Sequence, residues 1–307
     1  MNTRRQFLKT ASSSLLMSLV WKETKEIRLP LAFSTLGCPK WEWKKILDFA
    51  AQHGFAAIEL RGLEGNLDLP SHPVFAADRI EQTKREIHAS NLKIACVSSS
   101  ANLYMEDPVK RAKELADARR FIDLAAALGS PCVRVFGGKE ESDKSPAPDA
   151  ATKARVAAGL RELGKYAATR MVTVVIESHD HFTSSATLRD VLSQADSENV
   201  GLLWDAYHTF ADGQEDPELT VGQLGKWIRH THLKDSAGNG EKYVLTGRGT
   251  IPIERQISAL HAIAYKGFFC FEWEKLWHPE LADPEIAIAD FAHVIGDCLG
   301  NARACGL

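Results

Sequence analysis

Eight short apolar runs, separated by longer amphipathic stretches, restrict most strongly what this chain can fold into. Continuous apolar runs of five or six residues, bounded by Gly, Pro and Asn, are typical of parallel strands buried on both faces. Each run, together with the stretch that follows it, takes roughly 34 residues, which is the length of a βα unit. The predicted strands are Leu29–Ser34, Ala56–Leu60, Lys93–Ser98, Cys132–Phe136, Thr173–Glu177, Val200–Asp205, Ile228–Leu233 and Phe268–Glu272.

The stretches between these runs have helical periodicity. In the first of them, Ile46, Leu47 and Ala50 share one face. Glycine follows several stretches, as at Gly54 and Gly129, which is a helix-stop signal. The predicted helices are Trp43–His53, Arg79–Ser90, Lys110–Leu128, Ala150–Ala168, Thr187–Ala195, Glu254–Ala264 and Pro284–Leu299.

The count of eight repeats favours a closed sheet over an open one. An open, doubly wound sheet that binds a dinucleotide would carry Gly-x-Gly-x-x-Gly after its first strand. Residues 34–39 read Ser-Thr-Leu-Gly-Cys-Pro and do not match. The chain is therefore predicted to be of the α/β class, a single-domain (β/α)8 TIM barrel over residues 27–307. The loops Gly62–Pro73 and Gly137–Pro148 are predicted to lie in solvent at the end of the barrel where such folds keep their functional sites.

Residues 1–26 differ in kind from the rest and are predicted to be an export signal and linker. Arg4 and Arg5 are followed by Phe7 and Lys9, and then by a short apolar stretch that ends at Val20. This order matches the twin-arginine signal pattern. We therefore expect export by that pathway, to a periplasmic or membrane-anchored location that faces the periplasm. No Ala-x-Ala follows Val20, so the pattern leaves open whether the signal is cleaved.

Composition narrows the class of partner. The 45% hydrophobic and 25% charged residues are ordinary for a globular protein, and the net charge of -3 argues against a nucleic-acid partner. No apolar run reaches the roughly 18 residues of a membrane-spanning helix. The six cysteines form no Cys-x-x-Cys pair, and we expect mostly free thiols. The composition leaves homo-oligomerisation open.

Four consecutive predicted strands end in residue types that bind metals. The fifth ends in Glu177, the sixth in Asp205, and the eighth in Glu272, while the seventh contains His230 and His232. In a barrel, the carboxyl ends of neighbouring strands meet at one mouth. A carboxylate buried there is costly unless it is paired or coordinated, and three together require a cation or a proton.

The motifs around these residues resemble those of the xylose-isomerase-like family of sugar isomerases and epimerases. Asp205 and His208 resemble its Asp-x-x-His motif, and residues 230–235 resemble its His-x-His-x-Lys-Asp motif. Residues 247–251 resemble its Gly-x-Gly loop, and residues 271–274 resemble its last strand. The likeness extends over about residues 30–299. It implies the fold and a metal site, but not a substrate, because the family includes isomerases, epimerases, dehydratases, lyases and a DNA-repair endonuclease.

The resemblance implies one divalent metal ion, held by Glu177, Asp205, His232 and Glu272. Three carboxylates and one imidazole suit Mn²⁺, Mg²⁺ or Co²⁺, with Zn²⁺ as an alternative. In the family's epimerases the metal polarises a carbonyl of a small sugar or keto-sugar. Glu177 and Glu272 would then be the catalytic residues, one removing the neighbouring proton and the other returning it through an enediolate intermediate.

Four further residues are candidates for binding substrate. His208 either contacts a substrate oxygen or caps the local chain. Lys234 either stabilises an oxyanion or pairs with Asp235. Arg134 points either to the site or to solvent, and His179 lies two residues beyond Glu177 on the same face.

Two other functions remain open at this point. A metal-dependent lyase or dehydratase would use the same metal and base but would expel a leaving group by β-elimination. A non-catalytic sugar-binding barrel is the other alternative, although none of the four ligand residues is lost. The endonuclease branch of the family holds three zinc ions with extra histidines near strands 2 and 3. The ends of the second and third predicted strands carry no histidine, which argues against that branch.

Overall fold

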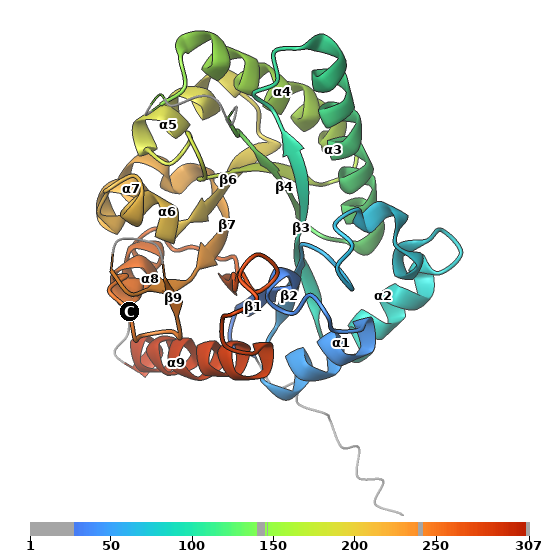
Figure 1. Cartoon of the computed structure of the whole chain (residues 1–307), viewed down its shortest axis with the longest axis vertical. Helices are drawn as coiled ribbons and strands as arrows, with labels where there is room; N and C mark the ends of the chain where they lie inside the picture. Colours follow the sequence, from blue (N-terminus) through green and yellow to red (C-terminus); the bar gives the residue numbers. More distant parts are fainter. Residues whose placement is uncertain (1–27, 140–144, 146, 239–241, 305–307) are drawn as a thin grey trace, which may run out of the picture.

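The computed structural model describes residues 28–139, 145, 147–238 and 242–304, and it confirms the closed barrel. The export signal predicted for residues 1–26 lies outside the described residues. Eight parallel strands close in the order β1-β10-β7-β6-β5-β4-β3-β2 (Figure 1). They are β1 (Leu31–Ser34), β2 (Ala57–Leu60), β3 (Lys93–Asn102), β4 (Cys132–Phe136), β5 (Thr173–Glu177), β6 (Val200–Asp205), β7 (Ile228–Leu233) and β10 (Phe269–Phe271).

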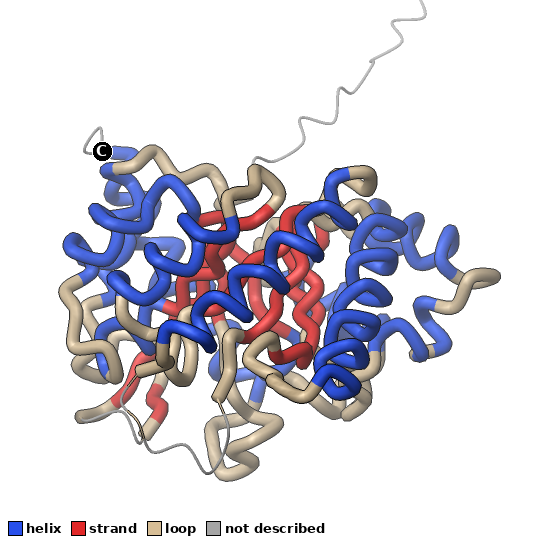
Figure 2. Tube along the Cα trace, turned by 90° about the horizontal axis from the view of Figure 1, so that it is seen from above, coloured by secondary structure: helices blue, strands red, loops and turns tan. Residues whose placement is uncertain are grey.

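Helices form the outer layer around this barrel, as Figure 2 shows. Every predicted helix has an observed counterpart. The helices are α1 (Trp43–Gln52), α2 (Ile80–Ala89), α3 (Pro108–Leu128), α4 (Ala150–Ala168), α5 (Ser185–Ala195), α6 (Ala206–Ala211), α7 (Pro217–Leu224), α8 (Ile253–Ala262) and α9 (Pro284–Ala304). Among the described residues, no helix combines the length and apolarity needed to cross a membrane.

Three local features differ from the sequence prediction. Helices α6 and α7 were not expected, because six and eight residues are too few to show a helical period. A small antiparallel pair, β8 (Asp235–Ser236) and β9 (Tyr243–Val244), follows β7. The loop after β2 is only partly solvent-exposed, because Leu63 and Leu69 are buried in the core.

The barrel interior is apolar at one end and charged at the other. Val175 and Leu203 belong to a small buried cluster inside the barrel. Each lies two positions before a carboxylate, Glu177 or Asp205, on the same face of its strand. The change from apolar to ionisable side chains therefore takes place within one strand, at its carboxyl end.

Candidate metal centre and active site

Four predicted ligand residues come together at the carboxyl end of the barrel. One ligand atom from each of Glu177, Asp205, His232 and Glu272 lies within 4.8 Å of the others, and all four side chains are buried. His232 Nδ1 is 2.9 Å from Glu177 Oε1 and 3.2 Å from Glu272 Oε1. The same nitrogen is 3.8 Å from Asp205 Oδ2. The imidazole therefore directs one nitrogen at all three carboxylates.

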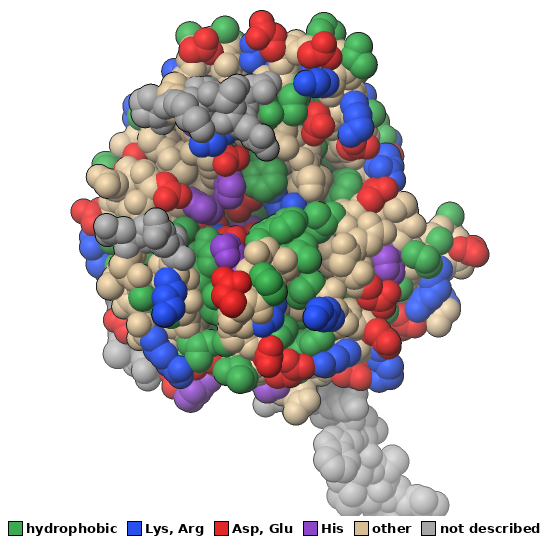
Figure 3. All heavy atoms as spheres, viewed as in Figure 1, with side chains coloured by type: hydrophobic (Ala, Val, Ile, Leu, Met, Phe, Trp, Pro, Cys, Tyr) green, Lys and Arg blue, Asp and Glu red, His purple; other side chains and the backbone are tan. Residues whose placement is uncertain are grey.

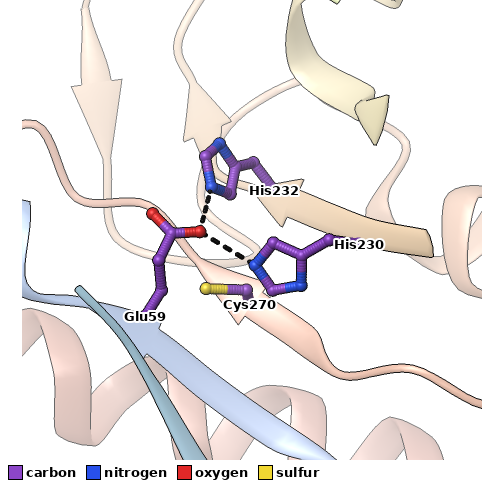
Figure 4. Close-up of side chains that lie close together, drawn as sticks. All are labelled: Glu59, His230, His232 and Cys270. Atoms are coloured by element: carbon purple, nitrogen blue, oxygen red, sulfur yellow. Dashed lines mark hydrogen bonds and ion pairs between the residues drawn. The ribbon is translucent and has the colours of Figure 1, made fainter. Parts of the chain in front are cut away.

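Glu59 of β2 fixes the orientation of that imidazole. His232 Nε2 donates to Glu59 Oε2 at 2.8 Å, and His230 Nε2 donates to the same oxygen at 2.8 Å (Figure 4). Burial would lower the pKa of His232, but Glu272, Glu59 and Glu177 raise it well above its ordinary value, so without a metal both ring nitrogens carry a proton. Because Nε2 gives its proton to Glu59, Nδ1 of His232 is the nitrogen that would bind a metal in exchange for its proton. His230 forms no ion pair with Glu177, Asp205 or Glu272. Its Nε2 bonds to Glu59 instead. The geometry thus distinguishes two histidines that alternation along the strand places on the same face.

The residues present fit a divalent cation. Burial alone would raise the pKa of the Glu177 carboxyl, but Arg134 and His232 lower it to about 2. Burial would likewise raise the pKa of Glu272, but His232 and Lys234 hold it well below its ordinary value. Buried carboxylates that stay ionised beside an imidazole nitrogen form the mixed oxygen and nitrogen donor set that Mn²⁺, Mg²⁺, Co²⁺ and Zn²⁺ accept.

Asp205 is held in place by its own helix. Its Oδ1 accepts from the backbone amides of Tyr207 and His208, so it is the N-cap of α6. The Ser178 hydroxyl donates to the Asp205 carbonyl and accepts from the Asp205 amide, which ties the ends of β5 and β6 together. These contacts leave Oδ2 of Asp205 to face the site.

Lys234 lies inside the site and does not pair with its neighbour Asp235. Its Nζ is 2.8 Å from Asp205 Oδ2, 2.5 Å from Glu272 Oε2 and 2.9 Å from Glu274 Oε1. Burial would lower the pKa of Lys234, but Asp205, Glu272 and Glu274 raise it well above its ordinary value. The lysine is therefore a fixed positive charge beside two of the ligand carboxylates.

Asp235 binds the backbone of the predicted Gly-x-Gly loop instead of Lys234. Its carboxylate accepts from the backbone amides of Ser236, Gly249 and Ile251. The loop after β9 is thus attached to the end of β7, next to Lys234.

Two buried arginines also lie near the ligand residues. Arg134 is in β4, and Arg61 directly follows β2. Arg134 Nε is 3.3 Å from Glu177 Oε2, and its guanidinium lies 3.8 Å from the centre of the Phe136 ring. Burial and the neighbouring Arg134 lower the pKa of Arg61 to about 9. Of the two alternatives for Arg134, the structure places it at the site, with 1% of its surface exposed.

Two histidines, His208 and His179, lie close to Asp205 and Glu177. His208 Nδ1 is 2.6 Å from Asp212 Oδ2, and its Nε2 has no hydrogen-bond partner and lies 3.8 Å from Asp205 Oδ2. The rings of His208 and His179 meet edge to face with centroids 4.5 Å apart. Burial alone would lower the pKa of His179, but Asp180 and Glu177 raise it above its ordinary value. Figure 3 shows histidine, acidic and basic side chains gathered in a hollow at the middle of this face.

Sequence reasoning missed Glu59, Arg61, Glu274 and Asp212. Glu59 had a usable signal, because a carboxylate inside the apolar run Ala-Ile-Glu-Leu is as unusual as those that ended the later strands. Asp212 gave no such signal in the sequence. It reaches His208 because the short helix α6, which was not predicted, places residues 208 and 212 one turn apart.

Comparison with solved structures finds the same fold in proteins of low sequence identity. The IOLI protein with a bound zinc atom has a TM-score of 0.74 at 19% identity, covering 89% of this chain and 99% of that one. L-ribulose 3-epimerase has a TM-score of 0.73 at 19% identity, covering 90% and 96%. The probable 3-DHS dehydratase AsbF of Bacillus anthracis, involved in petrobactin synthesis, has a TM-score of 0.69 at 18% identity, covering 87% and 99%.

A search of curated protein sequences finds no match to this chain. The model of the family described as Xylose isomerase-like TIM barrel matches residues 47–293, which is most of the chain. With the closed barrel and the ligand residues at its carboxyl end, this match shows that the chain belongs to the xylose isomerase-like TIM barrel family.

Proposed function

We propose that this protein is a metal-dependent isomerase or epimerase of a small sugar or keto-sugar. The observation that carries the proposal is the convergence of Glu177, Asp205, His232 Nδ1 and Glu272 within 4.8 Å. Similarity in fold to L-ribulose 3-epimerase is consistent with this reaction class. The metal, when bound, would polarise a substrate carbonyl and make the hydrogen on the neighbouring carbon acidic.

The positions of the two glutamates support proton transfer on both faces of a substrate. The four ligand residues come from the adjacent strands β5, β6, β7 and β10. Glu177 ends β5 and Glu272 directly follows β10, the outer two of these strands, so they flank the site from opposite sides. Their lowered pKa values keep both ionised at neutral pH, so that either can accept the proton from carbon. The other would return a proton to the opposite face only after taking one from solvent, and the first would release its proton to solvent to complete the cycle.

Lys234 and His208 complete the set of groups that a keto-sugar requires. Lys234 Nζ would donate to the substrate oxygen that gains negative charge during proton removal. His208 Nε2, which has no protein partner, would donate to or accept from a second hydroxyl. Asp212 holds His208 in position through Nδ1.

β-Elimination by a dehydratase or lyase is the second candidate, and the His208–Asp212 pair is the observation that favours it. An imidazole backed by a carboxylate, with its other nitrogen free, can protonate a departing oxygen after Glu177 or Glu272 has taken the proton from carbon. Similarity in fold to a probable dehydratase agrees with this alternative.

Exchange of substrate hydrogen with D₂O tests the proposal. Metal-loaded protein is incubated with a panel of keto-sugars, and deuterium at the carbon next to the carbonyl is measured by mass spectrometry and NMR. We expect incorporation with retention of the carbon skeleton and every oxygen. Loss of water or of an aglycone would assign the elimination reaction instead.

The glutamate variants provide the control. Glu177→Gln and Glu272→Gln should each slow exchange by roughly 10²–10⁴-fold, the usual contribution of a positioned acid or base. Glu285→Gln, which alters an exposed carboxylate on α9 that pairs with Lys45 of α1, should leave exchange unchanged. Exchange that survives both active-site substitutions would contradict the proposal.

A further inference from the structure

Arg61 and Arg134 hold hydrogen-bond donors that nothing in the described protein satisfies. Arg61 Nη1, Arg134 Nε and Arg134 Nη1 are buried and make no hydrogen bond, although Arg134 Nε lies in an ion pair 3.3 Å from Glu177 Oε2. The two side chains are only 5% and 1% exposed. Buried polar groups are nearly always hydrogen-bonded, and buried charges are nearly always paired, so donors left open in this way point to a missing partner.

Neither arginine has a carboxylate of its own. Among the described residues, no carboxylate oxygen lies within ion-pair distance of Arg61, and Arg134 faces only Glu177. Glu177 is one of the four ligand residues, so its charge is already shared with His232 and with any metal bound there. Two neighbouring guanidinium groups without a dedicated counter-ion repel each other, and an anion between them would relieve that repulsion.

We infer that Arg61 and Arg134 form a pocket for a carboxylate on the substrate, so that the protein acts on an acidic sugar. This inference rests on the proposed function, because it names the substrate class of the same site. The two arginines come from the β2–β4 part of the barrel, where β2 lies across from β6 and β4 lies across from β10. The carboxylate end of the sugar would face β2 and β4, and its carbonyl would face the ligand residues.

A carboxylate fits this pocket better than a hydroxyl or a phosphate. A neutral hydroxyl would satisfy one donor and leave both charges unpaired. The planar fork of each guanidinium matches the two oxygens of a carboxylate. A phosphate would bring nearly two negative charges beside Glu177, whose Oε2 already lies 3.3 Å from Arg134 Nε. Repulsion between those charges favours the singly charged group.

Binding of three matched sugars tests this inference without requiring turnover. D-fructuronate and D-fructose differ only in having a carboxylate or a hydroxymethyl group at one end, and D-fructose 6-phosphate carries a phosphate there. Dissociation constants for the metal-loaded protein are measured by titration calorimetry. We expect D-fructuronate to bind at least about 10-fold more tightly than either of the others. Equal binding of fructuronate and fructose, or tighter binding of the phosphate, would overturn the carboxylate pocket.

Arginine variants show whether the preference arises at this pocket. Arg61→Met and Arg134→Met should reduce the preference to about 2-fold or less, and Arg61→Lys should keep part of it, because the charge remains while the planar fork is lost. The matched control is Arg28→Met. Arg28 Nη1 donates to the carbonyls of Phe55, Ser90 and Asn91, so this change should lower stability and leave the preference intact.

Thermal unfolding of the metal-free variants separates a ligand-binding arginine from a structural one. Arg61→Met removes a buried charge that has no partner, so the melting temperature should stay the same or rise. A fall like that of Arg28→Met would make Arg61 a structural residue and overturn its role. The binding preference and the D₂O exchange are independent readouts. Exchange without a preference rejects the pocket alone, and a preference without exchange rejects the proposed reaction alone.

Discussion

At the scale of single residues, one carboxylate decides which histidine can serve as a ligand. His230 and His232 have the same residue type, strand and facing direction. Only Glu59, on a strand 171 positions away from His230 in sequence, turns His232 Nδ1 toward the other ligand residues. A carboxylate that fixes the tautomer of a metal-binding imidazole also raises its basicity as a ligand.

Metal content of histidine variants should follow this geometry. We expect His232→Ala to lose nearly all bound divalent metal, measured by elemental analysis after dialysis. His230→Ala should retain most of it, because His230 hydrogen-bonds to Glu59 and packs edge to face against the His232 ring but forms no ion pair with Glu177, Asp205 or Glu272. Glu59→Gln should weaken metal affinity by about 10–100-fold, the usual effect of losing such a supporting contact. Metal that survives His232→Ala but falls with His230→Ala would reverse the assignment.

The sequence allowed the convergence of the four candidate ligand residues to be predicted, but not the residues that support them. Glu177, Asp205 and Glu272 stand at the ends of apolar runs, where burial makes an ionisable side chain conspicuous. The contact between Glu59 and His232 depends on how the two strands are staggered across the barrel interior. Strand stagger is set by packing of the whole sheet, which no local pattern encodes.

At the scale of elements, the strands were predictable because each one is short, apolar and bounded by turn residues. The helices α6 and α7 were not, because their residues follow the ligand Asp205 without a full amphipathic period. The loop at residues 247–251 was recognisable only by resemblance. Its position comes from the two backbone amides of Gly249 and Ile251, which both donate to Asp235, and from the close approach of Gly249 to β8.

Gly249 should not tolerate a side chain. A Cβ there would lie 2.2 Å from Asp235 Oδ1 and 2.3 Å from the Ser236 carbonyl oxygen. Gly249→Ala should therefore lower the free energy of unfolding by about 1–3 kcal/mol, as overpacking does. The control is Gly222→Ala in α7, where a Cβ meets nothing within 4 Å. It should raise stability by about 0.5–1 kcal/mol through helix propensity, measured by urea denaturation. Equal effects of the two changes would disprove the close approach.

At the scale of the whole molecule, closure of the sheet brings together the first and the last strand of the barrel. Strand β1 pairs with β10 in the register Ala32 to Cys270, which completes the cylinder. The alternation of runs predicted eight strands, and the missing dinucleotide motif favoured closure over an open sheet. The sequence did not predict the register between the first and last strands, because that register depends on the tilt of all eight strands.

We propose that the protein is exported through the twin-arginine pathway. Arg4→Lys combined with Arg5→Lys should leave the protein in the cytoplasm, since paired arginines are the feature that this pathway reads. Immunoblots of fractionated cells measure the distribution. The matched control is Lys9→Arg, which keeps the local charge and should not change export. Normal export of the double variant would show that the N-terminal pattern was misinterpreted.

The hydrogen bonds of Arg28 decide which end of the barrel lies next to anything attached ahead of this residue. Its three carbonyl acceptors lie just before β2 and β3, at the amino ends of the strands and opposite the mouth that holds the ligand residues. Any tether joined ahead of Arg28, whether a lipid anchor or an affinity bead, therefore attaches at the end of the barrel where the strands begin. A molecule tethered in this way turns the end that holds Glu177, Asp205, His232 and Glu272 toward bulk solution, so that small solutes reach that end without passing the supporting surface.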